Sequence, residues 1–135
     1  MKFVAKMAAI VALTSLSLVA VANAHTVKHD STVTIQLKKG KGQDPDSFSG
    51  KVNSVRTRCE SGRTVKIFRR ADVVGEADVL VGKTTTDADG NYEFVLPGEA
   101  APGTYFAVAK REVLRRSANH LHVCKRATSA DRTVN

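Results

Sequence analysis

Short runs in which apolar and polar residues alternate recur along the chain from residue 33 onward. The first is 33–37 (VTIQL), and in the next run Phe48, Gly50 and Val52 fall on one face. Alternation with a period of two predicts half-buried β-strands. The same pattern, together with β-branched and aromatic residues, predicts further strands at 64–69, 79–86, 91–96, 104–109 and 122–128.

Breaks rich in glycine, proline and aspartate separate these runs, as at 39–46 (KGKGQDPD) and 97–103 (PGEAAPG). Seven short strands divided by such turns predict an all-β fold, a seven-stranded antiparallel β-sandwich in one domain. Gly82, inside the fourth run, indicates a β-bulge. Residues 110–116 contain no breaker; we expect a basic loop there, with a short helix as the alternative.

The stretch 84–94 (TTTDADGNYEF) holds two aspartates one residue apart, followed by glycine. An EF-hand calcium loop has oxygen ligands at positions 1, 3 and 5, glycine at 6 and glutamate at 12. With Gly90 at position 6, Thr85 occupies the first position and Leu96 the last, so two ligands are missing. We therefore predict a tight hairpin turn between two strands, in which glycine supplies a positive φ.

A family resemblance rests on the same stretch. The pattern T-D-x-x-G-x-Y-x-F at 86–94 is followed by Pro102-Gly103-Thr104-Tyr105 and Val108. In these motifs, and in the strands that precede them, residues 48–133 resemble transthyretin-like, or carboxypeptidase-regulatory-like, β-sandwich domains of small secreted bacterial proteins. The resemblance implies the fold. It implies little about activity, because such domains are structural, accessory or adhesive modules more often than enzymes.

The first 24 residues have the three-part pattern of a secretory signal peptide. Lys2 and Lys6 give a positive start, an apolar stretch follows, and Ala22-Asn23-Ala24 is a small-x-small cleavage site. We expect the mature chain to be a single domain at 25–135 that opens with a polar leader at 25–31. No second apolar segment follows, so we expect no membrane span after cleavage and a secreted or cell-envelope location.

Cys59 and Cys124 are the two cysteines of the chain, and both lie after the signal peptide. In an oxidising compartment an isolated pair is most simply a disulfide, which is our prediction. A metal site would need further ligands at the spacing typical of cysteine ligands, and the sequence has none.

Removal of the signal peptide leaves 19 basic against 13 acidic residues, a net charge of +6. A basic exported protein can meet anionic polymers of the cell wall or the extracellular space, or a protein partner. Nucleic acid is not expected, because no aromatic stacking platform is evident. A disulfide would gather basic residues around one end of the sandwich, and these are our candidate anion-binding residues: Arg56, Arg58, Arg63, Lys125 and Arg126. Further basic residues at 110–116 can add to them.

A metal-dependent enzyme is the first alternative. His120 and His122 are spaced to point to one face of a strand, as metal ligands often do. With Tyr105 they resemble, in order along the chain, the iron ligands of intradiol ring-cleaving dioxygenases. Two departures stand against this: residues 117–119 do not carry the Arg-Pro of that motif, and no tyrosine precedes Tyr92 to complete the ligands.

A copper site is the second alternative. Cleavage after Ala24 would make His25 the amino-terminal residue, whose amine and imidazole together can chelate copper. A second histidine is then required, and His29, His120 or His122 can supply it.

We therefore predict a secreted, monomeric, disulfide-linked β-sandwich without catalytic residues and without a cofactor. Its expected role is that of a structural, adhesive or binding module at the cell envelope or outside the cell. The chain contains no G-x-S-x-G nucleophile elbow, which removes one route to hydrolysis.

Overall fold

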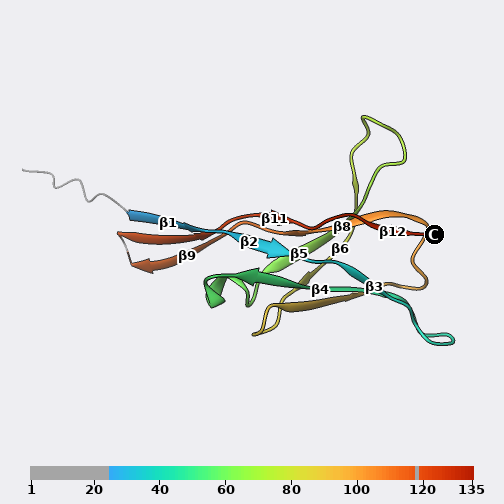
Figure 1. Cartoon of the computed structure of the whole chain (residues 1–135), viewed down its shortest axis with the longest axis horizontal. Coiled ribbons are helices and arrows are strands. Elements are labelled where there is room, and N and C mark those ends of the chain that lie inside the picture. The colour runs from blue at the N-terminus through green and yellow to red at the C-terminus, as the bar shows by residue number, and fades with distance from the viewer. Residues whose placement is uncertain (1–24, 118) are drawn as a thin grey trace, which may run out of the picture.

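The computed structural model describes residues 25–117 and 119–135 (Figure 1). Within them the chain forms twelve strands and one 3₁₀ helix, η1 (Thr57–Cys59). The strands are β1 (His25–His29), β2 (Ser31–Val33), β3 (Gln36–Lys38), β4 (Ser47–Ser54), β5 (Thr64–Arg69), β6 (Val79–Thr85), β7 (Asn91–Val95), β8 (Gly103–Ala109), β9 (Glu112–Ser117), β10 (His120–Cys124), β11 (Ala127–Thr128) and β12 (Arg132–Val134). The expected signal peptide lies outside the described residues. No helix in the described part of the chain is long and apolar enough to cross a membrane.

Nine of the strands build two antiparallel sheets. One sheet has the order β11-β8-β5-β6, and β12 pairs with another part of β8. In the other, β2 and β3 pair with successive parts of β4, and β7 lies on the opposite side of β4. The all-β class and the antiparallel sandwich are therefore confirmed. The strand count exceeds seven because the first expected strand is split into β2 and β3 and the last into β10 and β11, while β1, β9 and β12 were not expected.

The core lies between these two sheets. Phe48 and Val52 come from β4, and Val65 and Ile67 from β5; all four are fully buried. The Phe48 ring packs against that of Tyr105 on β8, with 4.7 Å between ring centroids. Burial of each such side chain contributes about 1.5–3 kcal/mol, so the alternating faces found in the sequence hold the sheets together.

The turn at 87–90 has the expected chemistry but not the expected pairing. Asp87 Oδ1 accepts hydrogen bonds from the backbone N–H groups of Asp89 and Asn91, each at 2.9 Å. Gly90 has φ +85°, and a Cβ there would lie 2.4 Å from the carbonyl oxygen of Val52. The hairpin prediction is wrong, however, because β6 pairs with β5 whereas β7 pairs with β4. The turn carries the chain from one sheet to the other.

Gly82 marks a β-bulge, as expected. The register of β5 and β6 shifts where Ile67 faces Gly82 and the next residue faces Leu80. A Cβ on Gly82 would lie 2.1 Å from the ring of Phe94, which belongs to the other sheet. The glycine therefore makes room for an aromatic ring of the facing sheet.

A third sheet, β1-β10-β9, extends away from the sandwich along the long axis of the molecule (Figure 1). We call residues 25–30 and 110–126 the arm. β9 and β10 are antiparallel, whereas β1 runs parallel to β10 with His25 opposite His120. Residues 25–29 of the expected polar leader form β1. The basic loop or helix expected at 110–116 is wrong, since residues 112–117 form β9. Each of these strands has few apolar residues. β1 obtains its backbone hydrogen bonds from β10, which is distant in sequence, whereas β9 forms a hairpin with β10.

Asp46 gives the fold an acid-sensitive point. Its side chain is buried, and its carboxylate accepts hydrogen bonds from Ala100 N, Lys39 Nζ and Gly40 N at 2.8–2.9 Å. The Ala100 N–H, then Lys39, then the Gly40 N–H lower the pKa of Asp46 to about 2. A depressed pKa in the folded state contributes stability above the unfolded pKa of about 4, which is lost as the pH falls through the folded value.

We therefore expect the urea midpoint to fall between pH 4 and pH 2, and Asp46→Asn to remove most of that slope. Asp46→Asn should also lower stability at neutral pH, because the ionised acceptor is lost. Asp44→Asn, an exposed neighbour, is the matched control. A variant with the slope of the unmodified protein would assign the acid sensitivity to other groups.

Candidate functional site

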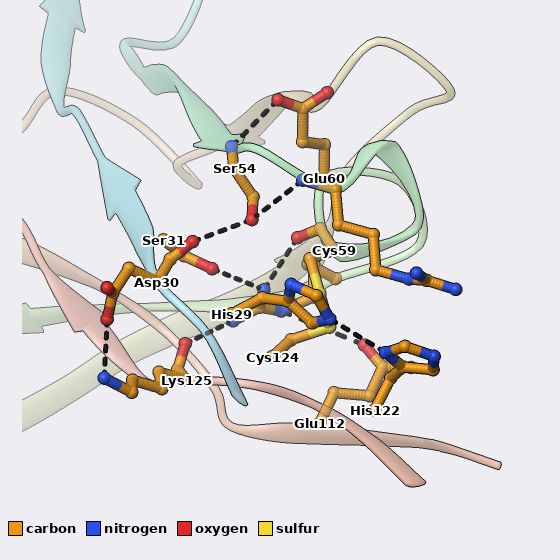
Figure 2. The surroundings of a disulfide bond; sticks show 12 residues. His29, Asp30, Ser31, Ser54, Cys59, Glu60, Glu112, His122, Cys124 and Lys125 are labelled. Carbon is orange, nitrogen blue, oxygen red and sulfur yellow. Dashed lines mark hydrogen bonds and ion pairs between the residues drawn. A yellow bond between two sulfur atoms is a disulfide. The ribbon is translucent and has the colours of Figure 1, made fainter. Parts of the chain in front are cut away.

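The disulfide joins the sandwich to the arm. Cys59 ends η1 and Cys124 ends β10, and their Cα atoms are 5.4 Å apart. Both residues are fully buried. The predicted pairing is confirmed, and Figure 2 shows the bond at the base of the arm, beside His29 and His122.

Arg63 lies beside the disulfide, at the junction between the sandwich and the arm, and is not part of an exposed surface. Its side chain is 0% exposed. Nη1 donates to Cys59 O at 2.7 Å and to Ser31 Oγ at 3.1 Å. Nη2 donates to Lys110 O at 2.9 Å and to Lys125 O at 3.0 Å, and Nε donates to Lys110 O at 3.2 Å. The expectation that Arg63 binds external anions is therefore wrong: its donors serve carbonyls of η1 and of the arm.

One carboxylate lies beside this buried charge. Glu112 Oε2 is 3.8 Å from Arg63 Nε. Burial lowers the pKa of the Arg63 guanidinium, and the charge of Glu112 opposes that shift. Because an arginine side chain starts from a very high pKa, it remains charged in this position.

The other four candidate basic residues lie around the junction with different exposure. Arg58 and Arg126 are exposed, and Arg56, just before η1, is half-buried. Lys125 is exposed and donates to Asp30 Oδ1 at 2.7 Å. That hydrogen bond, with the charge of Lys125, lowers the pKa of Asp30. The structure thus brings these residues to one end of the sandwich, as expected, with Lys125 partly neutralised.

Most of the net positive charge of residues 25–135 is carried by the arm. Residues 25–30 and 110–126 hold seven basic and two acidic residues, a net charge of +5, whereas the remaining residues from 31 onward hold twelve and eleven, a net +1. Six of the seven have described side chains, and all six are exposed: Lys28, Lys110, Arg111, Arg115, Lys125 and Arg126. The arm is therefore a projecting, strongly basic ribbon.

The strand register gives the arm two unlike faces. His25, Val27 and His29 alternate with Thr26 and Lys28 along β1, and residues of one parity share a face. Val27 is opposite His122, and Lys28 is opposite Val123. Across β10, Leu121 is opposite Arg115 of β9. Lys28 and Arg115 therefore lie on the face opposite to that of His29 and His122.

All four histidines of the chain lie on the face that carries His29 and His122, which we call the histidine face. The rings of His25 and His120 have centroids 5.3 Å apart, those of His120 and His122 4.8 Å, and those of His122 and His29 5.1 Å. His25 is exposed at the outer end, His29 and His120 are half-buried, and His122 is buried near the disulfide. His29 Nε2 and His122 Nδ1 are 2.9 Å apart, as the dashed line in Figure 2 marks.

Tyr105 does not belong to this cluster. It is buried in the sandwich core, where its hydroxyl donates to Ala101 O at 2.7 Å. On β8 it pairs with Arg132 of β12, and β12 lies at the end of the molecule away from the arm (Figure 1). The iron site that the sequence suggested at Tyr105, His120 and His122 is therefore not assembled.

A shallow polar groove of about 680 Å³ runs beside β4 and β7. Hydroxyl, amide and charged side chains line it, among them Thr34, Ser49, Asp87 and Asn91. Tyr92 forms part of the wall, and its hydroxyl donates to Thr34 O. Burial raises the pKa of Tyr92, which keeps this hydroxyl protonated. The described lining of this groove contains neither histidine nor cysteine.

The sequence analysis named all four histidines as candidate copper ligands, with His25 joined by one of the others, but it did not predict that they form one row. The pairing of β1 with β10 brings His25 and His29 beside His120 and His122. A parallel pair across 95 residues leaves no local signal. No family model matches the chain, and no curated protein or solved structure does so either.

Proposed function

We propose that the protein is a non-catalytic module, secreted or held at the cell envelope, that docks anionic polymers through its arm. The observation that carries the proposal is the concentration of exposed positive charge on the arm. The disulfide and the signal-like start of the sequence support a location outside the cytoplasm. The antiparallel sandwich supports the kinship with transthyretin-like domains that belongs to the same proposal.

An anionic polymer suits this surface for a physical reason. Binding of a polymer requires cations that are accessible and evenly held. On the arm the basic side chains are solvent-exposed, and the strands that carry them fix their spacing. Repeated phosphate, sulfate or carboxylate groups can then pair with several cations at once, each contact being weak alone. Binding of this kind has a high on-rate and weakens as salt rises, because exposed charges are screened.

A charge-reversal experiment tests the proposal. The arm variant carries Lys28→Glu, Arg111→Glu and Arg115→Glu, and the matched control carries Lys41→Glu, Lys51→Glu and Lys83→Glu, all at exposed positions. Both variants change the net charge equally. We expect the arm variant to lose about tenfold or more in affinity for polyphosphate and for heparin at low salt, and the control to lose much less.

Equal losses in the two variants would show that binding follows net charge and has no defined surface. Absence of binding by the unmodified protein to either polymer, and to purified anionic cell-wall polymer, would overturn the proposal. Far-UV circular dichroism of each variant checks that the sandwich is retained.

A further inference from the structure

We infer that His29 and His122 form a binding site for a divalent transition metal, and that the site favours Cu(II). The site lies on the histidine face, at the base of the arm. It does not depend on polymer docking, which is proposed for exposed cations on other parts of the arm.

The separation of the two ring nitrogens carries the inference. His29 Nε2 and His122 Nδ1 are 2.9 Å apart. Two ligands with metal–nitrogen bonds of about 2.05 Å lie about 2.9 Å apart when they are adjacent in a square plane, and about 3.3 Å apart in a tetrahedron. The 2.9 Å distance is that of a hydrogen bond between the two rings. Rotation of the rings lets both nitrogen lone pairs meet at one ion in place of that hydrogen bond, in neighbouring positions of a tetragonal coordination sphere. Imidazole also suits copper, which heads the affinity order of first-row divalent metals.

The backbone around both ligands is held firmly. His122 is 5% exposed and lies two residues before Cys124, whose disulfide fixes the end of β10. His29 ends β1, opposite Cys124, and its carbonyl accepts a hydrogen bond from Lys125 N at 2.9 Å. A pair of ligands on paired strands needs only side-chain rotation to face a common ion, and a preorganised pair loses little entropy on binding.

Among the described residues, no three His, Cys, Asp or Glu side chains are arranged to hold one ion. His120 has its ring centroid 4.8 Å from that of His122, so a rotation can bring it in as a third ligand. Water takes the remaining positions. A site of this kind keeps exchangeable positions instead of forming a closed structural centre.

The charge of the arm does not forbid a cation here. Lys28 and Arg115 lie on the opposite face of the ribbon. The Glu112 carboxylate is near the junction, 3.8 Å from the buried Arg63. Exposed like charges beyond about 8 Å are largely screened at physiological salt, so they weaken the binding of a metal ion without abolishing it.

Titration of the protein with Cu(II), in a form without a polyhistidine tag and with glycine as competitor, tests the inference. We expect one ion per chain, and a loss of affinity of about 100-fold in His29→Ala. His25→Ala is the matched control on the same strand and face, and it should lose far less. Zn(II) should bind more weakly than Cu(II).

Electron paramagnetic resonance of the unmodified protein provides a readout that does not depend on variants. We expect a tetragonal Cu(II) spectrum with nitrogen hyperfine structure from at least two imidazoles, and loss of one nitrogen in His29→Ala. Circular dichroism and thermal melting confirm that this edge-strand variant folds.

Two results would overturn the inference. One is Cu(II) affinity that is the same in His29→Ala and in the unmodified protein. The other is affinity lost in His25→Ala and retained in His29→Ala, which would place copper at the amino-terminal residue instead. Polymer docking is measured without metal, so its failure leaves this result unaffected.

Discussion

Replacement of Arg63 by leucine is expected to lower the free energy of unfolding by about 4 kcal/mol. Leucine fills part of the volume but donates no hydrogen bond, so the carbonyls of Cys59, Lys110 and Lys125 lose the donor that now serves them. A buried acceptor left without its donor costs about 1–3 kcal/mol, and three carbonyls are left so here. Since a domain of this size is stable by about 5–15 kcal/mol, the variant should be close to unfolding at 37 °C.

Urea unfolding followed by circular dichroism measures this effect. Arg58→Leu removes an exposed arginine of the same end of the molecule, and we expect a change within about 0.5 kcal/mol. Arg63→Lys should fall between the two, because an ammonium group cannot reproduce the planar set of donors. A loss below about 1 kcal/mol in Arg63→Leu would mean that water reaches the buried carbonyls and donates to them in place of the guanidinium.

The second large effect is expected from the disulfide. The double variant Cys59→Ala/Cys124→Ala opens a covalent loop with a sequence separation of 65. In the chain-entropy model a loop of this size is worth about 4 kcal/mol, because the crosslink restricts the unfolded chain. We expect a loss of that order in the free energy of unfolding, together with faster amide hydrogen exchange in β10, which the bond anchors at its end.

Reduction of the unmodified protein should reproduce the stability of the double variant, which is the internal control. The double variant avoids the free thiol that a single substitution would leave. A double variant that keeps its stability would indicate that the unfolded chain already holds these ends together.

The sequence predicted the fold where the signals were local. Alternation placed β5 at 64–69 with the bounds that the structure has, and Gly82 was rightly assigned to a bulge. The cysteine pair followed from composition and compartment. The turn at Asp87 to Gly90 was also predicted from its chemistry, but local chemistry does not say which strand each side of a turn will pair with.

Two strands of the arm, β1 and β9, escaped prediction because neither has a clear alternating pattern. β1 has one apolar residue, Val27, and β9 is rich in long charged side chains. Neither shows the pattern of a half-buried strand, since neither packs a full face on the core. Their pairing with β10 supplies the hydrogen bonds, and a contact between His25 and His120 cannot be read from either segment alone.

Arg63 was misassigned for a related reason. Arginine is rarely fully buried, so an arginine near a cysteine was expected at the surface. Its partners are backbone carbonyls, which every residue possesses and which therefore leave no mark in a sequence. The buried position depends on four segments converging, and only the folded chain brings them together.

The parallel pairing of β1 with β10 also sets an order of events while the chain is being made. Synthesis proceeds from the amino end, so β1 emerges first and its partner only about 95 residues later. Cys59 likewise waits for Cys124. Strand β1 therefore stays without its partner until β10 has also been made, and the arm is completed late.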